Sequence, residues 1–293
     1  MEIMGIVNVT PDSFSDGGKW SDPQAAIAHG RDLIAAGASI LDIGGESTRP
    51  GATALSPDEE WTRIEPVVSE LSPHVTVSVD TYHSETARRA AKAGAKIIND
   101  VTGGQGDPQM FEVVSALDVD YILQHGRGNA ANMNDLAVYS EHVATELTKE
   151  MLRSRGSAVA AGISPERIIL DPGLGFAKVG DQDWDALGGL EEYLHLGHRV
   201  LIGPSRKRFL AGVSQASVAS ERDLATAVLS AMLADAGVWA VRVHNVAATA
   251  TAIAVHERLW QAVDEWQDMR GIRDAHDANH HIDFLDMHSA KGE

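Results

Sequence analysis

Eight short apolar runs alternate along the chain with longer stretches whose apolar residues recur at helical spacing. The runs span residues 3–8, 39–44, 75–80, 96–99, 119–125, 167–171, 199–203 and 239–244. Each is too short for a helix, and such alternation is typical of a parallel sheet whose strands are joined by helices. Eight strands favour a closed barrel, because open doubly wound sheets usually contain about five or six. The sequence therefore predicts an α/β fold, an eight-stranded parallel β/α barrel of the TIM type.

The intervening helical stretches include residues 22–36, 84–93, 139–161 and 221–235. A glycine stands at or just after the end of each, namely Gly37, Gly94, Gly162 and Gly237. Helices commonly stop at a residue of left-handed conformation, which glycine adopts without strain. We therefore expect these helices to end at the glycines.

The chain is predicted to form a single domain over residues 1–270. Barrels of this kind routinely run to about 250 residues, and 44% of the 293 residues are hydrophobic, enough for a full core. No internal stretch is rich enough in Pro, Gly and Ser to act as a linker. Residues 271–293 are polar and contain four histidines. We expect a mobile terminus there, with a metal-binding tract as the alternative.

Composition excludes several classes of function. The chain has no cysteine, which excludes disulfides, thiolate metal sites and a cysteine nucleophile. The formal net charge of -18 opposes binding to nucleic acid. Neither a signal peptide nor a run of about 20 apolar residues is visible. We expect a cytoplasmic protein that acts on small molecules and has no nucleic-acid or membrane partner.

Nearly every predicted strand ends in, or is followed directly by, a polar side chain. These residues are Asn8, Asp80, Asn99, His125, Asp171, Ser205 and His244. A parallel barrel brings the carboxyl ends of its strands to one rim. Asp80, Asn99 and Asp171 could each cap a helix. Together, however, they offer acceptors and an amide to a planar nitrogen heterocycle, as in the readout of base edges.

Long polar loops and basic residues follow the same strands. NVTPDSFSDGG and GGESTRPGAT follow the first two predicted strands and are longer than the usual turn of about 2 to 6 residues. DPGLGFAK, GPSRKRF and RVH lie at the carboxyl ends of the last three predicted strands. The basic residues of this rim are Arg49, Arg206, Lys207 and Arg242. Because the loops after strands 7 and 8 of such barrels often bind phosphate, we predict an anion site here.

Taken in order, these segments resemble the dihydropteroate synthase family from Met4 to about Trp260. The resemblance rests on NVTPDSFSDGG, DIGGESTRPGA, SVDT, INDVTGG, DPGLGFAK, GPSRKRF and RVHNV, each at the strand end where the family has it. It implies that (7,8-dihydropterin-6-yl)methyl diphosphate condenses with 4-aminobenzoate to give 7,8-dihydropteroate and pyrophosphate in folate biosynthesis. The diphosphate would leave early, and the amine would attack a pterin-methylene cation. Mg²⁺ is the implied cofactor, and a homodimer is the implied assembly.

The resemblance also implies roles for individual residues. The pterin and its diphosphate would contact Thr48, Asp80, Asn99, Asp171, Phe176, Lys207, Arg242 and His244. The 4-aminobenzoate pocket would be formed by Phe14, Arg49, Pro50, Phe176, Ser205 and Lys207. The residues with catalytic roles would be Asp80, Lys207, Arg242 and His244. Mg²⁺ would have Asn8 as a ligand or as an outer-shell contact.

Four positions depart from the family pattern. Gly126 stands where a bulkier residue, often Met, is common, and Ala130 stands where Pro is frequent. Asp183 occupies a position that is often Asn, and Asn245 one that is often Asp. We expect a looser wall of the pterin pocket beside His125 and altered hydrogen bonding around the site, without loss of activity.

Two other functions are compatible with parts of this pattern. A pterin-binding methyltransferase that passes a methyl group from a folate to a corrinoid would share the Asp and Asn contacts. It would have no use for a diphosphate site, which the segment from Arg242 to His244 predicts. A non-catalytic paralogue that binds pterin or acts as a scaffold would not need the first two loops, which are intact.

Overall fold

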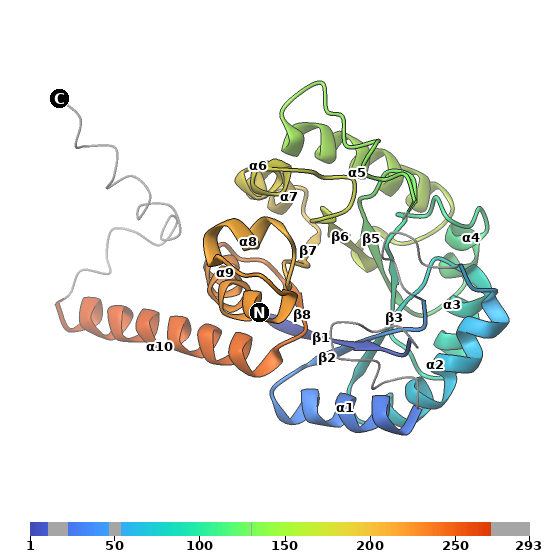
Figure 1. The fold of residues 1–293 in the computed structure, drawn as a ribbon, viewed down its shortest axis with the longest axis horizontal. Coiled ribbons are helices and arrows are strands. Elements are labelled where there is room, and N and C mark those ends of the chain that lie inside the picture. Colours follow the sequence, from blue (N-terminus) through green and yellow to red (C-terminus); the bar gives the residue numbers. More distant parts are fainter. Residues whose placement is uncertain (11–22, 47–53, 130, 271–293) are drawn as a thin grey trace.

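A computed structural model of the chain describes residues 1–10, 23–46, 54–129 and 131–270. Eight parallel strands pair in chain order, and the last pairs with the first to close the barrel (Figure 1). The strands are β1 (Glu2–Asn8), β2 (Ile40–Gly44), β3 (Thr76–Asp80), β4 (Ile97–Asp100), β5 (Asp120–Gln124), β6 (Ile168–Asp171), β7 (Arg199–Ile202) and β8 (Ala240–Val243). Each matches its predicted run to within one residue at either end, so the predicted barrel is confirmed.

The helices lie around the outside of the barrel (Figure 1). They are α1 (Pro23–Ala35), α2 (Pro57–Leu71), α3 (Ser84–Lys92), α4 (Met110–Ser115), α5 (Val143–Ala160), α6 (Gln182–Gly188), α7 (Leu190–Leu194), α8 (Phe209–Ser214), α9 (Asp223–Asp235) and α10 (Val246–Arg270). The glycines expected to end helices all have a positive φ, of +107° at Gly37 and +84° at Gly237 for example. One predicted helix, 139–161, begins only at Val143. The Tyr139 hydroxyl instead donates to the Ala177 carbonyl at 2.8 Å.

The apolar core has two parts, because successive side chains on a strand point to opposite faces. Outward-facing strand residues such as Leu41, Ile43 and Val79 pack against the helices. Inward-facing residues fill the part of the barrel nearer the amino ends of the strands. They are Met4, Ile40, Ile97, Ile122, Ile169, Leu201 and Ala240. Two residues further along several strands the inward side chain is polar, as at Asp42, Asn99 and Asp171. The change from apolar to polar inside the barrel thus occurs toward the carboxyl ends of the strands.

Helix α10 is the last described element and extends away from the barrel (Figure 1). Its first turns pack on the core through Val246 and Ile253, which are 1% and 5% exposed. No residue from 254 to 269 is buried. Across the described part of the chain, no helix is both long and apolar enough to cross a membrane.

Candidate active site

A pocket of about 620 Å³ opens at the carboxyl ends of the strands. Eight of the predicted site residues line it: Asn8, Asp80, Asp171, Phe176, Ser205, Lys207, Arg242 and His244. Asn99 is buried beside Asp80, its partner in the β3–β4 register. Phe14, Thr48, Arg49, Pro50 and Ala130 lie outside the described residues. The barrel therefore brings together side chains from β1, β3, β6 and β8 and from the loops after β6, β7 and β8.

An ion-pair cluster crosses the barrel between β8, β2 and β3. Arg242 Nε donates to Asp42 Oδ2 at 2.6 Å, and Arg242 Nη2 donates to Asp80 Oδ2 at 2.9 Å. Burial raises the pKa of Asp80 above its usual value, while the Arg242 guanidinium opposes that shift. Burial disfavours the charge of Arg242, but Asp42 and Asp80 outweigh it and raise its pKa. The guanidinium is thus held in place at the wall of the pocket.

Buried acceptors without partners lie next to this cluster. Asn99 Nδ2 donates to Asp42 Oδ2 at 3.1 Å. Among the described residues, Asn99 Oδ1, Asp42 Oδ1 and Ser78 Oγ are buried and have no hydrogen-bond partner. An unsatisfied buried polar group costs about 1 to 3 kcal/mol. These acceptors lie on β2, β3 and β4, below the pocket-lining Asp80 and beside the Arg242 ion pairs.

Asp171 and Lys207 both line the pocket and carry opposite charges that influence each other. Asp171 is 2% exposed, and its Oδ1 accepts from the Gly173 N–H at 2.7 Å. Gly173 has φ +65°, and a Cβ there would lie 2.0 Å from the His125 carbonyl oxygen, so only glycine fits this turn. Burial raises the pKa of Asp171, and the positive charge of Lys207 opposes the shift. Burial lowers the pKa of Lys207 to about 8, against the opposing effect of Asp171.

Phe176 and Lys207 give the pocket an aromatic and cationic side. Lys207 Nζ lies 5.1 Å from the centre of the Phe176 ring, within the range of a cation–π contact. Lys207 Nζ also donates to the Leu174 carbonyl. Asp183, one of the departures from the family pattern, accepts from the Gly175 N–H at 2.6 Å. It therefore supports the loop that carries Phe176.

Ser205 and His244 are in direct contact. The Ser205 hydroxyl accepts from the His244 backbone N–H at 3.0 Å and lies 2.8 Å from His244 Nδ1. A hydroxyl that donates to Nδ1 places the ring proton of a neutral imidazole on Nε2. Asn245, another departure, accepts from the Ala248 N–H at 3.1 Å and caps helix α10.

The basic residues of the rim do not all serve the pocket in the same way. Arg206 lines the pocket, but its guanidinium makes a two-pronged pair with Asp223 at 2.6 and 2.9 Å. Arg242 makes ion pairs with Asp42 and Asp80, whereas Lys207 donates to the Leu174 carbonyl and is influenced by the charge of Asp171. Lys207 and Arg242 therefore remain the candidates for binding an anion among the predicted basic residues that the structure describes.

The wall beside His125 is braced from helix α5. His125 is 4% exposed, and its Nε2 lies 2.8 Å from Glu150 Oε2. Burial lowers the pKa of His125 to about 4, so the ring is neutral and Nε2–H donates to the carboxylate. Arg127 Nη2 also donates to Glu150, at 2.7 Å. Gly126 lines a separate hollow of about 580 Å³ with Arg127 and Glu150 and is not among the residues that line the main pocket.

Asn8 is suited to the implied Mg²⁺. It ends β1 and lines the pocket together with Arg242 and His244. Its amide oxygen is a hard donor, and Mg²⁺ commonly binds through one or two protein oxygens together with substrate phosphates. The chemistry of this position therefore fits the cation.

Asp42 is the principal site residue that the sequence analysis missed. It is fully buried and accepts from both Arg242 and Asn99. A signal was present, because Asp42 is the single charged residue within an otherwise apolar run. A buried carboxylate in such a place requires a charged or hydrogen-bonding partner.

Comparison with known proteins agrees with this geometry. Residues 4–244 match the family described as pterin binding enzyme. The chain is 44% identical to a dihydropteroate synthase from Mycobacterium leprae over 261 residues, which cover 87% of this chain and 92% of the relative. This chain belongs to the dihydropteroate synthase family. The resemblance inferred from the motifs is thereby confirmed.

Solved structures of the dihydropteroate synthase family share the fold. The Yersinia pestis enzyme in a sulfonamide drug complex has a TM-score of 0.84 and 35% identity, covering 89% of this chain and 94% of that chain. The Xanthomonas albilineans enzyme with 4-aminobenzoic acid has a TM-score of 0.81 and 40% identity, covering 90% of this chain and 93% of that chain.

Proposed function

We propose that this chain condenses (7,8-dihydropterin-6-yl)methyl diphosphate with 4-aminobenzoate, giving 7,8-dihydropteroate and pyrophosphate in folate biosynthesis. The observation that carries the proposal is the composition of the pocket. The Asp80 and Asp171 carboxylates suit the N–H groups of a pterin, while Arg242 and Lys207 supply positive charge for an anion. Family membership over most of the chain points to the same reaction.

In the proposed mechanism, departure of the diphosphate precedes attack by the amine. The bond between the pterin methylene and the diphosphate oxygen breaks, and both electrons leave with the diphosphate. The amine nitrogen of 4-aminobenzoate then forms the new C–N bond and loses a proton. An aryl amine is a weak nucleophile, so stabilising the leaving group and the cation contributes more than activating the amine.

The proposed role of each residue in this reaction follows from its charge and its neighbours. Arg242, held by its ion pairs with Asp42 and Asp80, and His244, held by Ser205, would bind the diphosphate. Asp171 would hold the pterin and favour the positive charge that develops on it. Lys207 and Phe176 would flank the 4-aminobenzoate and also contact the pterin diphosphate. Asn8 would hold Mg²⁺, which when bound neutralises charge on the departing diphosphate.

Product formation by the purified protein tests the proposal. With the pterin diphosphate, 4-aminobenzoate and Mg²⁺, we expect equal amounts of pyrophosphate and dihydropteroate. A folded protein that binds the pterin but releases no pyrophosphate would instead be a non-catalytic paralogue. Methyl transfer from a folate to a corrinoid, without pyrophosphate release, would identify the methyltransferase.

Sulfonamides provide a second test, because they mimic 4-aminobenzoate. The related Yersinia pestis enzyme has been solved in a sulfonamide drug complex. We expect sulfonamides to raise the apparent KM for 4-aminobenzoate in this chain without changing kcat. Purely noncompetitive inhibition would contradict the proposed pocket at Ser205, Phe176 and Lys207.

We further propose that the chain forms a homodimer through helices α9 and α10, which pack against each other. Helix α9 exposes a stripe at four-residue spacing, in which Leu224 is 75%, Val228 is 53% and Met232 is 65% exposed. On α10, Val255 and Leu259 are 66% and 62% exposed. An apolar stripe on a surface helix normally faces a packing partner. A second copy presenting the same stripes would cover them symmetrically.

A further inference from the structure

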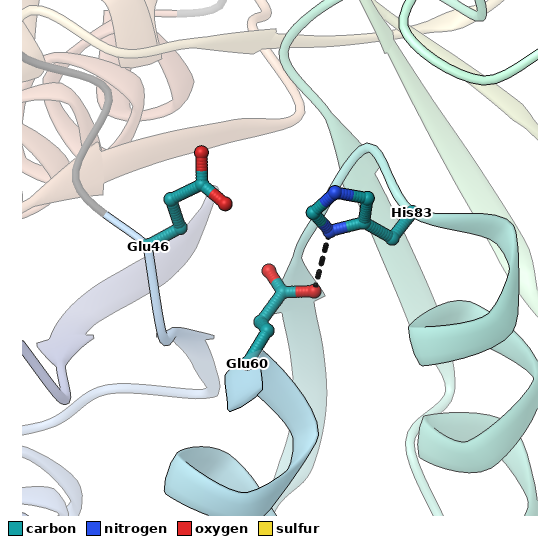
Figure 2. A group of neighbouring side chains, drawn as sticks. All are labelled: Glu46, Glu60 and His83. Carbon is teal, nitrogen blue, oxygen red and sulfur yellow. Dashed lines mark hydrogen bonds and ion pairs between the residues drawn. The ribbon is translucent and has the colours of Figure 1, made fainter. Parts of the chain in front are cut away.

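Three potential metal ligands converge beside the pocket, apart from Asn8. Glu46 follows β2, Glu60 lies in α2, and His83 directly precedes α3 (Figure 2). One ligand atom from each of the three lies within 4.8 Å of the other two. His83 Nδ1 is 3.1 Å from Glu60 Oε2. The side chains come from three segments that the barrel holds in fixed positions.

The buried carboxylate of Glu60 carries an oxygen without a partner. Its side chain is 1% exposed. Glu60 Oε2 accepts from the Thr81 hydroxyl at 2.8 Å and contacts His83, whereas Oε1 is buried and has no hydrogen-bond partner among the described residues. Figure 2 shows the oxygen not bonded to His83 turned toward Glu46. Thr81 and His83 thus provide partners for Oε2 alone, and Oε1 is left as a buried acceptor open to a further ligand.

Glu46 is held in place by neutral donors. The Tyr82 hydroxyl donates to Glu46 Oε1 at 2.6 Å, and the Leu55 N–H donates to Glu46 Oε2 at 3.1 Å. Neither donor neutralises the carboxylate, and each carboxylate oxygen can accept a further bond. Glu46 also lines the main pocket, which gives an ion a route to the cluster.

We propose that Glu46, Glu60 and His83 bind a divalent transition-metal ion such as Zn²⁺, at a site distinct from the Mg²⁺ position at Asn8. One imidazole with two carboxylates suits Zn²⁺, Mn²⁺ or Co²⁺ better than Mg²⁺, which prefers oxygen alone. Metal–ligand distances of about 2.0 to 2.2 Å place tetrahedral ligand atoms about 3.4 Å apart. The His83–Glu60 pair is already near that separation, at 3.1 Å, whereas ligand atoms up to 4.8 Å apart would have to approach by side-chain rotation. A water molecule would complete the coordination.

The ion would cross-link three parts of the rim. Glu46 lies at the carboxyl end of β2, and His83 lies three residues after Asp80 at the end of β3. Glu60 belongs to the helix between these two strands. The ion would therefore link the segment that carries Asp80 to β2 and α2 and give Glu60 Oε1 a partner.

Cobalt binding to the full chain tests this site without substrates, so its outcome is independent of the proposed activity. Protein stripped with a chelator is titrated with Co²⁺ in excess Mg²⁺, and the visible absorption of bound Co²⁺ is recorded. We expect one high-affinity ion per chain. Loss of a direct ligand in His83→Ala should weaken Co²⁺ binding by about 100-fold or more. Wild-type affinity in folded His83→Ala would overturn the site.

Two controls separate this site from other histidines. His74→Ala alters an exposed histidine and should bind Co²⁺ like the wild type. Replacing the four histidines of residues 271–293 with alanine should also leave the high-affinity ion in place. If that variant loses the ion, the tail is the ligand and the proposal fails.

A cysteine at position 83 gives a direct signature of ligation. The chain has no cysteine, so His83→Cys would supply its only thiolate. Because thiolates bind Zn²⁺ and Co²⁺ strongly, the Co²⁺ complex should show a thiolate-to-cobalt charge-transfer band in the near ultraviolet. Circular dichroism confirms folding of each variant. A folded His83→Cys protein without this band would show that position 83 does not reach the ion.

Discussion

Asp171 illustrates at the residue scale how burial prepares a carboxylate for a ligand. The side chain is almost inaccessible, and burial raises its pKa while Lys207 and the Gly173 N–H favour the ionised form. A hydrogen bond to the backbone could be only a structural cap. Asp171 also lines the main pocket, a position that suits a ligand-binding role.

Asp171→Asn separates the two roles, since an asparagine oxygen can still accept from the Gly173 N–H. We expect pterin binding, measured by calorimetry, to weaken by about 2 to 5 kcal/mol, because a buried charge-assisted contact is lost. Asp120→Asn is the matched control, because Asp120 lies at the start of β5 and pairs with Arg199. Unchanged pterin affinity in Asp171→Asn would show that the residue is a cap.

Lys207 predicts a pH dependence of ligand binding. Burial lowers its pKa to about 8, so its positive charge is present below that pH and is lost above it. Binding of the anionic pterin diphosphate should therefore weaken between pH 7 and pH 9. Lys207→Arg keeps its charge over this range and should give a flatter profile. An identical decline in both proteins would assign the effect to another group.

At the scale of elements, β5 and α5 are joined by the contacts among His125, Arg127 and Glu150. Burial opposes the charge of Glu150, but hydrogen bonds from His125 and Arg127 lower its pKa to about 2. Arg127 also stacks on the Tyr139 ring, with 4.1 Å from its guanidinium carbon to the ring centre. These contacts tie His125 and Arg127, which follow β5, to helix α5.

His125 predicts how this connection responds to acid. Its pKa is about 4 when folded and near 6.5 in an unfolded chain, so the unfolded state binds more protons between these values. Its contribution to stability is therefore present above pH 6.5 and declines as the pH falls. Between pH 6.5 and 5, the free energy of unfolding measured with denaturant should fall by about 2 kcal/mol more in the wild type than in His125→Gln. Parallel pH profiles would contradict a neutral buried His125.

At the scale of the whole molecule, the apolar stripes on α9 and α10 are the feature that the barrel alone does not explain. The pocket uses the carboxyl ends of the strands, whereas the stripes lie on two adjoining outer helices. Residues 254–269 of α10 include no buried position. An isolated helix gains little stability in water, so packing against a partner would stabilise this segment.

Charges introduced on α9 test the proposed homodimer. Val228→Glu together with Met232→Glu should convert a dimer into a monomer in sedimentation analysis, because buried unpaired carboxylates oppose association. Lys149→Glu on α5 serves as a control for added negative charge on an exposed helix, since Lys149 is 53% exposed. A wild-type chain that sediments as a monomer at micromolar concentration would refute the dimer.

Local patterns in the sequence determined the order and nearly all the bounds of the strands, because side-chain periodicity directly reflects which face is buried. The polar strand ends likewise predicted Asp80, Asp171, Arg242 and His244 at one rim, since parallel strands must end together. The chemical identity of the ligand came from family resemblance, because polar residues alone are compatible with several heterocycles.

Only the tertiary structure decided which of these residues pair with one another. Asp42 forms an ion pair with Arg242, which lies 200 positions away in the sequence, and Arg206 forms one with Asp223. Glu60 lies beside Glu46 and His83. Such contacts depend on barrel closure and on side-chain burial, and neither leaves a periodic trace in the chain. A carboxylate that looks like any other in the sequence acquires its role from the neighbours that folding places beside it.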